Sequence, residues 1–397
     1  MLGSAPDRSG PLELRLSIHD SMHLIHRKDW EAVAKDGSPY LGYDHLKALE
    51  DVMAGTMQFR YAIFHCAKYR PVGIACFQIV DLEDNGSAYG DRIRKFGTII
   101  GSRIISELKV RSLVCGNAFH CGTHGAHFTK DIPCDHQMLA LEMAMEQLRA
   151  DERLVPRISV SIFKDLGVDQ LLSARVLEDK GYHPLAMDVS MRMNIAPAWK
   201  DLDGYLEALT AKARTRIRSI QGRSSEVEVR DLSAEEIKRS IPALQQLFDQ
   251  VLERSPFIFG RLSVSIFAQW KAIHGDRFLF HGFYLNGVLI GFSSAFSFGD
   301  TLDAQLVGLD YQHNEKHMVY QRILLDLLIS AFKLGARAIN FGRTAEQAKS
   351  SIGALPVQLP FYVKHRNRVA NRLIGPFLRK VEPAEFEQRS PFRKPVL

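Results

Sequence analysis

The chain has 397 residues, of which 46% are hydrophobic and 24% are charged, and its formal net charge is +6. This balance predicts a globular protein of two or three domains and excludes collagen-like, disordered and disulfide-scaffold proteins. The charge is uneven, because residues 361–397 carry a net +6 and residues 209–223 a net +5, which leaves a slightly acidic remainder.

The first half of the chain alternates helix and strand patterns. Apolar residues recur at helical spacing over residues 44–53, which predicts a helix. Residues 60–66 and 72–80 have the composition of two strands joined by a turn at Tyr69-Arg70-Pro71. The elements expected next are loops with a short helix over 81–109, a strand over 110–115, a helix over 135–149, a strand over 157–163, a helix over 171–180 and a strand over 187–193.

The composition changes near Ile195-Ala-Pro-Ala-Trp199, and we place a domain boundary there. A basic linking helix follows over residues 203–221, and a second α/β block is expected over residues 227–364. Its expected elements are helices over 234–253 and 264–273, a hairpin over 278–299, a strand over 302–309, a helix over 314–334 and a strand over 336–341.

Residues 278–299 form the strongest candidate for a membrane span, because they contain no Asp, Glu, Lys or Arg. Asn286-Gly287 lies at their centre between two runs of aromatic and β-branched residues. This dipeptide is a strong signal for a two-residue hairpin turn. We therefore expect two buried strands rather than a membrane helix.

The cysteine content indicates a reducing compartment. The chain has five cysteines, an odd number in a long chain, which favours free thiols and a cytoplasmic location. Residues 1–16 contain four charged residues and no long apolar run, so they do not resemble a signal peptide.

The two halves share one outline of hairpin, helix and strand. The hairpin around Val72-Gly73-Ile74 parallels the one around Ile290-Gly291-Phe292. The helix and strand that follow the first hairpin also have counterparts after the second. This order favours a duplicated α/β domain over a solenoid.

Residues 341–354, Phe-Gly-Arg-Thr-Ala-Glu-Gln-Ala-Lys-Ser-Ser-Ile-Gly-Ala, resemble the C-terminal signature of a bacterial GNAT-like acyltransferase family related to the FemAB-type peptidyl transferases. Residues 311–320 and 361–364 fit the same pattern, and residues 205–218 resemble the helix that links the two halves. The resemblance covers nearly the whole chain and is sharpest over residues 205–364. It implies an α/β fold of two tandem GNAT-type domains, each with a mixed sheet flanked by helices, and transfer of an acyl or aminoacyl group to an amine.

On this basis the expected domains are an N-terminal GNAT-like domain over residues 1–198, a basic linking helix over 199–225, a C-terminal GNAT-like domain over 226–365 and a basic tail over 366–397.

The sequence departs from ordinary GNAT enzymes at the site that would bind acyl-CoA. Those enzymes carry a glycine-containing turn whose N–H groups bind the pyrophosphate at the start of the long helix. The matching residues here, 312–317, contain no glycine, and Glu315 adds a negative charge. Asn314, as the N-cap of the long helix, and Lys316 are the candidate cofactor-binding residues. Acyl-CoA, an aminoacyl-tRNA and an acyl carrier all stay open as donors.

The loop after Phe341 supplies the main catalytic candidates. Arg343 is a bidentate donor suited to phosphate or carboxylate. Glu346 and Lys349 are three residues apart and would share a helix face. In this interpretation Lys349 positions an anionic substrate and Glu346 accepts a proton from the attacking amine. The alternative is a surface ion pair that contributes under about 1 kcal/mol.

Two further polar positions fall in the second half. Tyr320 lies on the predicted long helix and is a candidate general acid. Gln305 and Asp303 lie on the strand over 302–309, where GNAT-type sheets face the acceptor. We expect Gln305 to bind substrate, and a buried hydrogen-bonding role is the alternative for each position.

The first half contains a loop rich in cysteine and histidine over residues 115–127, followed by Cys134 and His136. Zinc takes thiolate and imidazole ligands, but the spacing matches no usual paired-ligand motif, and no metal is expected. We expect this loop to line a cleft between the domains. Its candidate substrate-binding residues are Asn117, His120 and His124, with packing and turn geometry as the alternative.

Three functions follow from these features. The first is an N-acyltransferase with a small-molecule or peptide-like amine acceptor. The second is an aminoacyl-tRNA-dependent transferase whose residues 212–223 and basic tail contact RNA phosphate. The third is a non-catalytic ligand-binding protein, which the absent pyrophosphate turn favours. Residues 366–380 are basic and amphipathic, so they would rest on an anionic membrane surface or cover the core. No DNA partner is expected.

Overall fold

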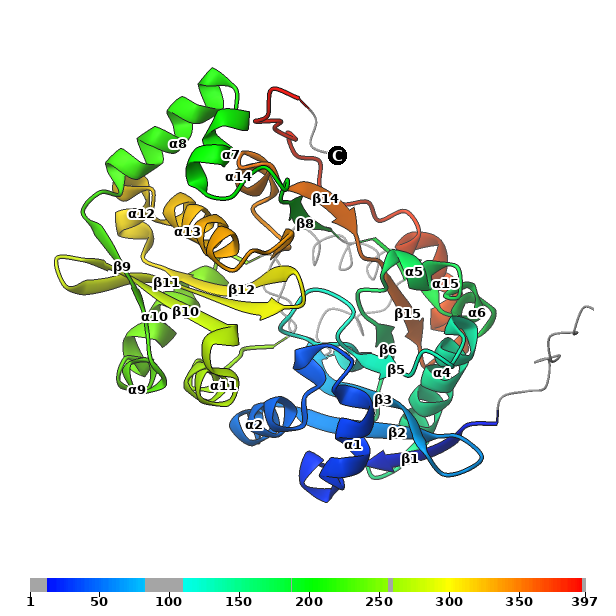
Figure 1. The fold of residues 1–397 in the computed structure, drawn as a ribbon. Helices are drawn as coiled ribbons and strands as arrows, with labels where there is room; N and C mark the ends of the chain where they lie inside the picture. The colour runs from blue at the N-terminus through cyan, green and yellow to red at the C-terminus, as the bar shows by residue number, and fades with distance from the viewer. Residues whose placement is uncertain (1–12, 83–109, 187, 256–259, 395–397) are drawn as a thin grey trace, which may run out of the picture.

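Two mixed β-sheets flanked by helices organise the chain (Figure 1). The computed structural model describes residues 13–82, 110–186, 188–255 and 260–394. The strands before residue 188 are β1 (Arg15–His19), β2 (Gln58–His65), β3 (Pro71–Leu82), β4 (Val110–Cys115), β5 (Ala126–Phe128), β6 (Val160–Phe163) and β7 (His183–Leu185). The helices there are α1 (Arg27–Ala34), α2 (Tyr43–Met53), α4 (Cys134–Ala150), α5 (Val168–Leu171) and α6 (Arg175–Asp179), with 3₁₀ turns at Met22–Leu24 and Pro39–Leu41.

The rest of the chain repeats this alternation. Its strands are β8 (Val189–Asn194), β9 (Val227–Asp231), β10 (Phe278–Leu285), β11 (Val288–Phe298), β12 (Thr301–Leu309), β13 (Ala338–Gly342), β14 (Leu355–Gln358) and β15 (Phe361–His365). Its helices are α7 (Leu202–Ala208), α8 (Ala211–Arg223), α9 (Ala234–Arg239), α10 (Ile241–Leu252), α11 (Ile266–His274), α12 (Tyr311–His317), α13 (Val319–Lys333), α14 (Glu346–Ser350) and α15 (Arg368–Leu378), with a 3₁₀ turn at Gly275–Arg277.

The two sheets have the same strand order. The first runs β1-β2-β3-β4-β6-β15-β7, with β5 paired to β3, and the second runs β9-β10-β11-β12-β13-β8-β14. In each sheet one central pair is parallel, β4 with β6 and β12 with β13, while its other neighbours are antiparallel. The predicted α/β fold of two tandem units with mixed sheets is confirmed.

The two sheets exchange strands. β8 precedes the linking helices in sequence but pairs with β13 and β14 in the second sheet. β15 comes near the end of the chain but lies between β6 and β7 in the first sheet. Sheet pairing therefore crosses the expected boundaries at residues 198 and 365, and the proposed division into separate domains stays a prediction.

The β10–β11 hairpin forms as its turn residues require. Asn286 and Gly287 both have positive φ, 50° and 79°, and Leu285 pairs with Val288 across the turn. This backbone matches the two-residue turn that Asn-Gly favours. Residues 278–298 are thus two strands, and no helix in the described part of the chain is long and apolar enough to cross a membrane.

Three helices expected to be continuous are each divided in two. Pro242 stands at the start of α10, and a proline inside a helix would remove a backbone hydrogen bond, so α9 ends before it. Thr210 separates α7 from α8 and its side chain accepts from the N–H of Ala213. Met318, with φ of 50°, separates α12 from α13, so residues 314–334 are not one helix.

Asn314 caps the long helix from the preceding turn rather than from its expected N-cap position. The Asn314 side-chain oxygen accepts from the N–H of Tyr320, at 2.9 Å. The other end is as expected, since Gly335 follows α13 with a φ of 65°, the position where glycine ends helices. Residues 83–109, where loops and a short helix were expected, lie outside the described residues.

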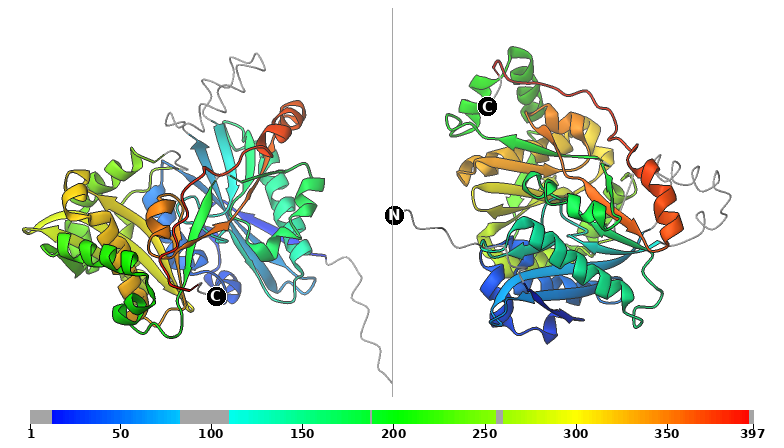
Figure 2. Two further views of the ribbon diagram at one scale, coloured as in Figure 1. Left: turned by 90° about the horizontal axis from the view of Figure 1, so that it is seen from above. Right: turned by 90° about the vertical axis from the view of Figure 1, so that its right-hand side faces the viewer.

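One apolar core spans both halves of the chain. Leu49 on α2 and Trp270 on α11 belong to the same cluster of buried residues, and the two helices contact each other. The C-terminal residues return to the linking helices, where the Phe392 ring stacks on Trp199 with centroids 4.9 Å apart. The three views in Figures 1 and 2 show the two sheets side by side, joined by crossing segments.

The strand exchange predicts that neither half folds alone. A fragment of residues 13–198 would lack β15, which leaves an edge of β6 unpaired, and a fragment of residues 199–394 would lack β8 beside β13. We expect rapid amide hydrogen exchange and aggregation of each fragment, because unpaired strand edges recruit other chains. The intact chain provides the control, and a soluble fragment with protected sheet amides would contradict this prediction.

Candidate active site

A cavity of about 440 Å³ lies where the two halves meet. Its lining includes Phe248 and Leu306, which belong to the core on one face of the second sheet, and Leu324 and Phe341, which belong to the core on the other face. The cavity therefore passes through the sheet. This volume is within the range of small-molecule sites.

The strand register explains the opening. The parallel strands β12 and β13 pair only over residues 301–303 and 338–340, although β12 continues to Leu309. Beyond Asp303 the two strands separate. The corresponding pair in the first sheet, β4 with β6, stays paired to the end of both strands, at Cys115 and Phe163.

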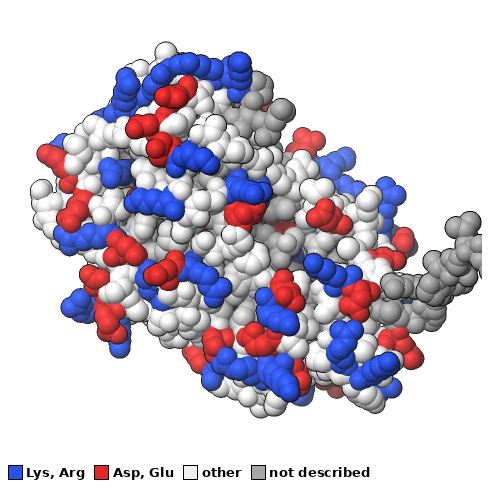
Figure 3. Space-filling model, viewed as in Figure 1, with Lys and Arg blue, Asp and Glu red and all other residues white. Residues whose placement is uncertain are grey.

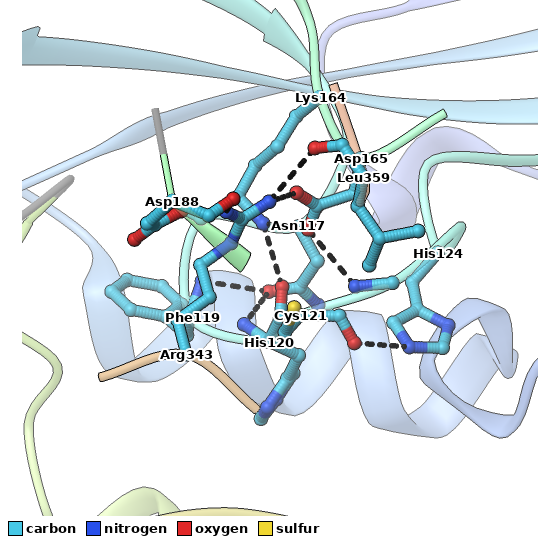
Figure 4. A network of polar contacts seen from close by, with 12 residues as sticks. Asn117, Phe119, His120, Cys121, His124, Lys164, Asp165, Asp188, Arg343 and Leu359 are labelled. Carbon is cyan, nitrogen blue, oxygen red and sulfur yellow. Dashed lines mark hydrogen bonds and ion pairs between the residues drawn. The ribbon is translucent and has the colours of Figure 1, made fainter. Parts of the chain in front are cut away.

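A loop from the first half closes one side of the cavity. The Asn117 side-chain oxygen accepts from the N–H groups of Phe119 (3.0 Å) and His120 (3.2 Å), which fixes a turn. The turn places Phe119, His120 and Cys121 on the cavity wall (Figure 4). Asn117 itself is buried and does not line the cavity, so its observed contacts fix the turn, and binding of a substrate by Asn117 stays a prediction.

A buried ionic network fastens this loop to the second half (Figure 4). The Asp165 carboxylate accepts hydrogen bonds from Lys164, from Arg343 and from the N–H of Gly122, the last at 2.9 Å. Burial alone would raise the pKa of Asp165, but the charges of Lys164 and Arg343 and these hydrogen bonds hold it below its usual value. The carboxylate is therefore ionised and paired.

Arg343 lines the cavity, but its guanidinium is already engaged by protein groups. It pairs with Asp165 and Asp188 and donates to the carbonyl oxygens of Asp188 and Leu359, both at 3.0 Å. Its charge is thus neutralised by two carboxylates. The contacts observed for Arg343 join the halves, and binding of a substrate anion by Arg343 stays a prediction.

Lys349 on α14 is 4% exposed and lines the cavity. Its Nζ donates to the carbonyl oxygens of Gly342, at 3.2 Å, and Arg343, at 2.6 Å. Burial lowers the pKa of Lys349 to about 8, against the opposing charge of Glu346. An ammonium group carries three N–H bonds, and the described residues supply no third hydrogen-bond partner.

Asp303 supplies a buried carboxyl group at the point where β12 and β13 separate. It accepts from the hydroxyl of Tyr40, which in turn accepts from the Gln305 amide, with Nε2 and Oη 2.7 Å apart. Burial raises the pKa of Asp303 to about 7, although Tyr40, Asn340 and Arg192 act to lower it. The carboxyl can therefore exchange a proton near neutral pH.

His120 faces the cavity with unmatched polar atoms. It is 3% exposed, its ring stacks on Tyr40 at 4.5 Å between centroids, and neither ring nitrogen has a hydrogen-bond partner among the described residues. Burial lowers the pKa of His120 well below its usual value. The ring is thus neutral and offers one donor and one acceptor.

His124 does not line the cavity. Its Nδ1 lies 2.9 Å from the Ser38 hydroxyl and its Nε2 lies 3.1 Å from the carbonyl oxygen of Cys121. Nε2 must therefore carry the proton that it donates to this carbonyl. Burial lowers the pKa of His124 to about 4, so the ring is neutral. Its Nε2 also lies 3.9 Å from the Asp303 carboxylate, and contact of His124 with a substrate stays a prediction.

The other predicted residues divide between the cavity and its surroundings. Tyr320 and Asn314 line the cavity, and burial raises the pKa of Tyr320, which therefore keeps its proton. Glu346 does not line it, although its charge acts on Lys349 and Tyr320. Lys316 is exposed on α12, and its carbonyl oxygen accepts from Arg223.

The cavity does not fit the pyrophosphate of acyl-CoA in the GNAT manner. The Asn314 side chain already takes the N–H of Tyr320 at the start of α13, and Glu315 is exposed beside it. The described residues contain no group of three His, Cys, Asp or Glu side chains able to hold a metal ion. Burial also raises the pKa of Cys121, which makes its thiol a poor nucleophile.

Tyr40 and Lys164 are not among the residues predicted from the sequence, and Asp303 is predicted there only as a buried hydrogen-bonding residue or a residue facing the acceptor. In the sequence, Asp303 is marked only as a single carboxylate within an apolar strand pattern. A carboxyl group buried in such a strand needs a polar partner. Tyr40 comes from a 3₁₀ turn 263 residues away in sequence, and no local pattern connects the two.

No protein-family model matches the chain, and no curated protein matches it. Among solved structures it resembles FemX, with a TM-score of 0.52 and 12% identity over 88% of this chain and 98% of that one. The structure of L-PGS from Bacillus licheniformis gives a TM-score of 0.48 and 12% identity over 84% and 92% of the two chains. A tandem GNAT protein from the clavulanic acid biosynthesis pathway gives 0.48 and 10% over 89% and 99%.

The FemX likeness covers both sheets, and its low identity makes it evidence of fold. It agrees with the duplicated sheet order and with the resemblance found at residues 341–354. The chain therefore shares the fold of FemX, with two units in tandem.

Proposed function

We propose that the protein is an N-acyltransferase that moves an acyl or aminoacyl group from an activated ester or thioester to an amine. The observation that carries this proposal is the pair of buried ionisable groups on one cavity, the Asp303 carboxyl with a pKa of about 7 and the Lys349 ammonium. Perturbed acid and base groups that share a cavity are typical of catalytic sites.

The reaction needs a proton acceptor and a donor to the carbonyl oxygen. The amine nitrogen attacks the acyl carbon and Asp303 takes the proton that the amine loses. The bond to the leaving oxygen or sulfur then breaks, and the proton passes from Asp303 to the leaving group. The remaining N–H bond of Lys349 stabilises the oxygen of the tetrahedral intermediate, a type of contact that contributes about 3–4 kcal/mol in other enzymes. Tyr320, which keeps its proton, donates a hydrogen bond to the leaving group.

The assignment of the base differs from the expectation for Glu346. Glu346 lies outside the cavity lining, whereas Asp303 lines it and has a pKa matched to neutral pH. Glu346 has a supporting place in this proposal, because its charge favours the protonated form of Lys349. His120, with two unmatched nitrogens, and Gln305 are the proposed contacts for the amine substrate.

The apolar wall supports an aliphatic acyl group as part of the substrate. Leu252 on α10, Leu306 on β12 and Leu327 on α13 line the cavity together. Each methylene group buried there would contribute about 0.8 kcal/mol, or roughly a fourfold gain in binding. We infer that the acyl chain has several carbons. We also infer that its carrier does not bind as coenzyme A does in ordinary GNAT enzymes.

A second candidate donor is an aminoacyl-tRNA, favoured by one observation. The two basic segments meet, since Arg393 donates from Nε to the carbonyl oxygen of Leu209 at 3.0 Å. Burial lowers the pKa of Arg216, and the nearby charge of Arg389 lowers it further. Lys and Arg side chains gather along the upper edge of the molecule, over α8 (Figure 3). A cationic surface of this kind is suited to phosphate groups.

Asp303→Asn is expected to abolish transfer while stabilising the fold. The raised pKa of Asp303 means that the folded state binds more protons than the unfolded state between about pH 4 and pH 7. Stability of the native protein should therefore fall as pH rises through this window, and the variant should lack that fall. Melting temperatures across the window measure this effect.

The activity of the native protein should rise about tenfold per pH unit below pH 7, because the base must be ionised.

The matched control for the Asp303→Asn variant is Asp300→Asn, which removes the same charge from an exposed residue. An Asp303→Asn variant that keeps full kcat/KM would remove Asp303 from the mechanism.

Lys349→Met is expected to lower both activity and stability. It deletes the hydrogen bonds to two carbonyl oxygens, and each buried unsatisfied group costs about 1–3 kcal/mol. We expect kcat to fall by about a hundredfold or more and the melting temperature to drop by several degrees. Lys316→Met, on the exposed face of α12, should change neither, and loss of activity there would restore the expected cofactor role of Lys316.

Acyl-chain selectivity tests the apolar wall independently of the carrier. Acyl-N-acetylcysteamine thioesters of increasing length present the acyl group without coenzyme A. We expect kcat/KM to rise about fourfold per added methylene until the cavity is filled. Leu327→Trp should lose this gain for long chains and keep acetyl transfer, while Leu327→Met, of similar volume, should retain the native profile. A native profile that is flat with chain length would contradict an aliphatic substrate.

A further inference from the structure

The C-terminal helix α15 has one face packed on the protein. Ile374 and Phe377 pack against the core, and Leu378 is buried. The Asn371 side chain fixes the orientation of the helix, because its amide donates to the carbonyl oxygen of Gly181 at 2.8 Å and its oxygen accepts from the N–H of His365 at 2.8 Å. These contacts fix which side of α15 faces the protein and which side faces outward.

This outer face combines exposed aliphatic side chains with unpaired cations. Val369 is 69% exposed and Leu373, one helical turn later, is 47% exposed. The five surrounding cations are Arg366, Arg368, Arg372, Arg379 and Lys380. Residues 366–381 contain no Asp or Glu, and none of these cations forms an ion pair within the described part of the chain.

The position of α15 leaves this face outward. The helix follows β15, lies against the edge strand β7 of the first sheet, and stands at the periphery of the molecule in both views of Figure 2. Single exposed leucines are ordinary. Leu139 and Met143 form a similar exposed pair on α4. The pair on α15 differs because five cations surround it, none with an ion-pair partner in the described part of the chain.

We propose that the outer face of α15 docks the protein on the surface of an anionic lipid bilayer. The cations meet the lipid headgroups, and Val369 and Leu373 enter the boundary between headgroups and acyl chains. Pro376, also exposed, lies on the same side of the helix. The helix lies on the membrane and does not cross it.

The chemistry of the face favours lipid over nucleic acid. A nucleic acid would use the charges and leave Val369 and Leu373 in water. The other basic surface, α8, buries both of its isoleucines, Ile217 and Ile220, and so offers phosphate contacts without an apolar element. This inference rests on α15 alone and does not depend on the proposed acyl transfer.

Flotation of the full-length protein with lipid vesicles tests the proposal. We expect binding to vesicles of phosphatidylcholine mixed with phosphatidylglycerol, none to phosphatidylcholine alone, and weaker binding at high salt. Arg368→Glu with Arg372→Glu should reduce binding by about tenfold or more. Val369→Ser with Leu373→Ser, which keeps every charge, should also reduce it.

The matched control is Lys212→Glu with Arg218→Glu on α8, which makes the same change of charge on two exposed residues. It should bind vesicles as the native protein does, and all variants should keep the native melting temperature because the substituted side chains are exposed. Failure of the native protein to bind anionic vesicles would overturn the proposal, as would equal loss in the α8 control.

Unchanged vesicle binding by the serine variant would also overturn it, because the aliphatic contact would then be absent. A tRNA-binding measurement on the same proteins separates the two polyanions. Loss of tRNA binding in the α15 charge variant, with vesicle binding retained, would assign this face to nucleic acid instead.

Discussion

The buried carboxylate of Asp165 is the contact on which the shape of the cavity depends. It lies beyond the end of β6 and binds Lys164, the N–H of Gly122 and Arg343, which follows β13 in the other sheet. Its side chain is fully excluded from solvent, so each partner compensates a charge that would otherwise be buried alone. Lys164 also donates to the carbonyl oxygen of His120 at 2.8 Å. One anion thus holds the loop of the first half and the loop of the second half against the same cavity.

Strand exchange makes this contact possible. β8 ends in the second sheet and β15 in the first, so the backbone crosses between the sheets on both sides of the cavity. The crossing brings Asp188 and Leu359, which flank the exchanged strands, to the guanidinium of Arg343. The two sheets are therefore joined both by the exchanged strands and by the ionic network at Arg343.

Sequence predicted the local features of this fold and missed those that depend on long-range pairing. The hairpin at Asn286-Gly287, the helix end at Gly335 and the duplicated order of elements follow from turn chemistry and periodicity, which act over a few residues. The membership of β8 and β15 does not, because an exchanged strand has the same apolar pattern as a strand kept in its own sheet. For the same reason Lys349 was found from a motif, whereas Tyr40 and Asp303 were joined only by the fold.

The duplication is symmetric in strand order but asymmetric in one register, and this asymmetry decides where the cavity lies. In the first sheet β4 and β6 remain paired to Cys115 and Phe163, so no space opens between them. In the second, β12 leaves β13 after Asp303, and the separation exposes a carboxyl group at the point where sheet hydrogen bonds stop. Such a position is buried enough to raise the pKa of Asp303 to about 7, yet open enough for a substrate to reach it. The first unit, in which β4 and β6 stay paired, contributes the loop of His120 as a wall of the cavity. The two duplicated units thus line one shared cavity.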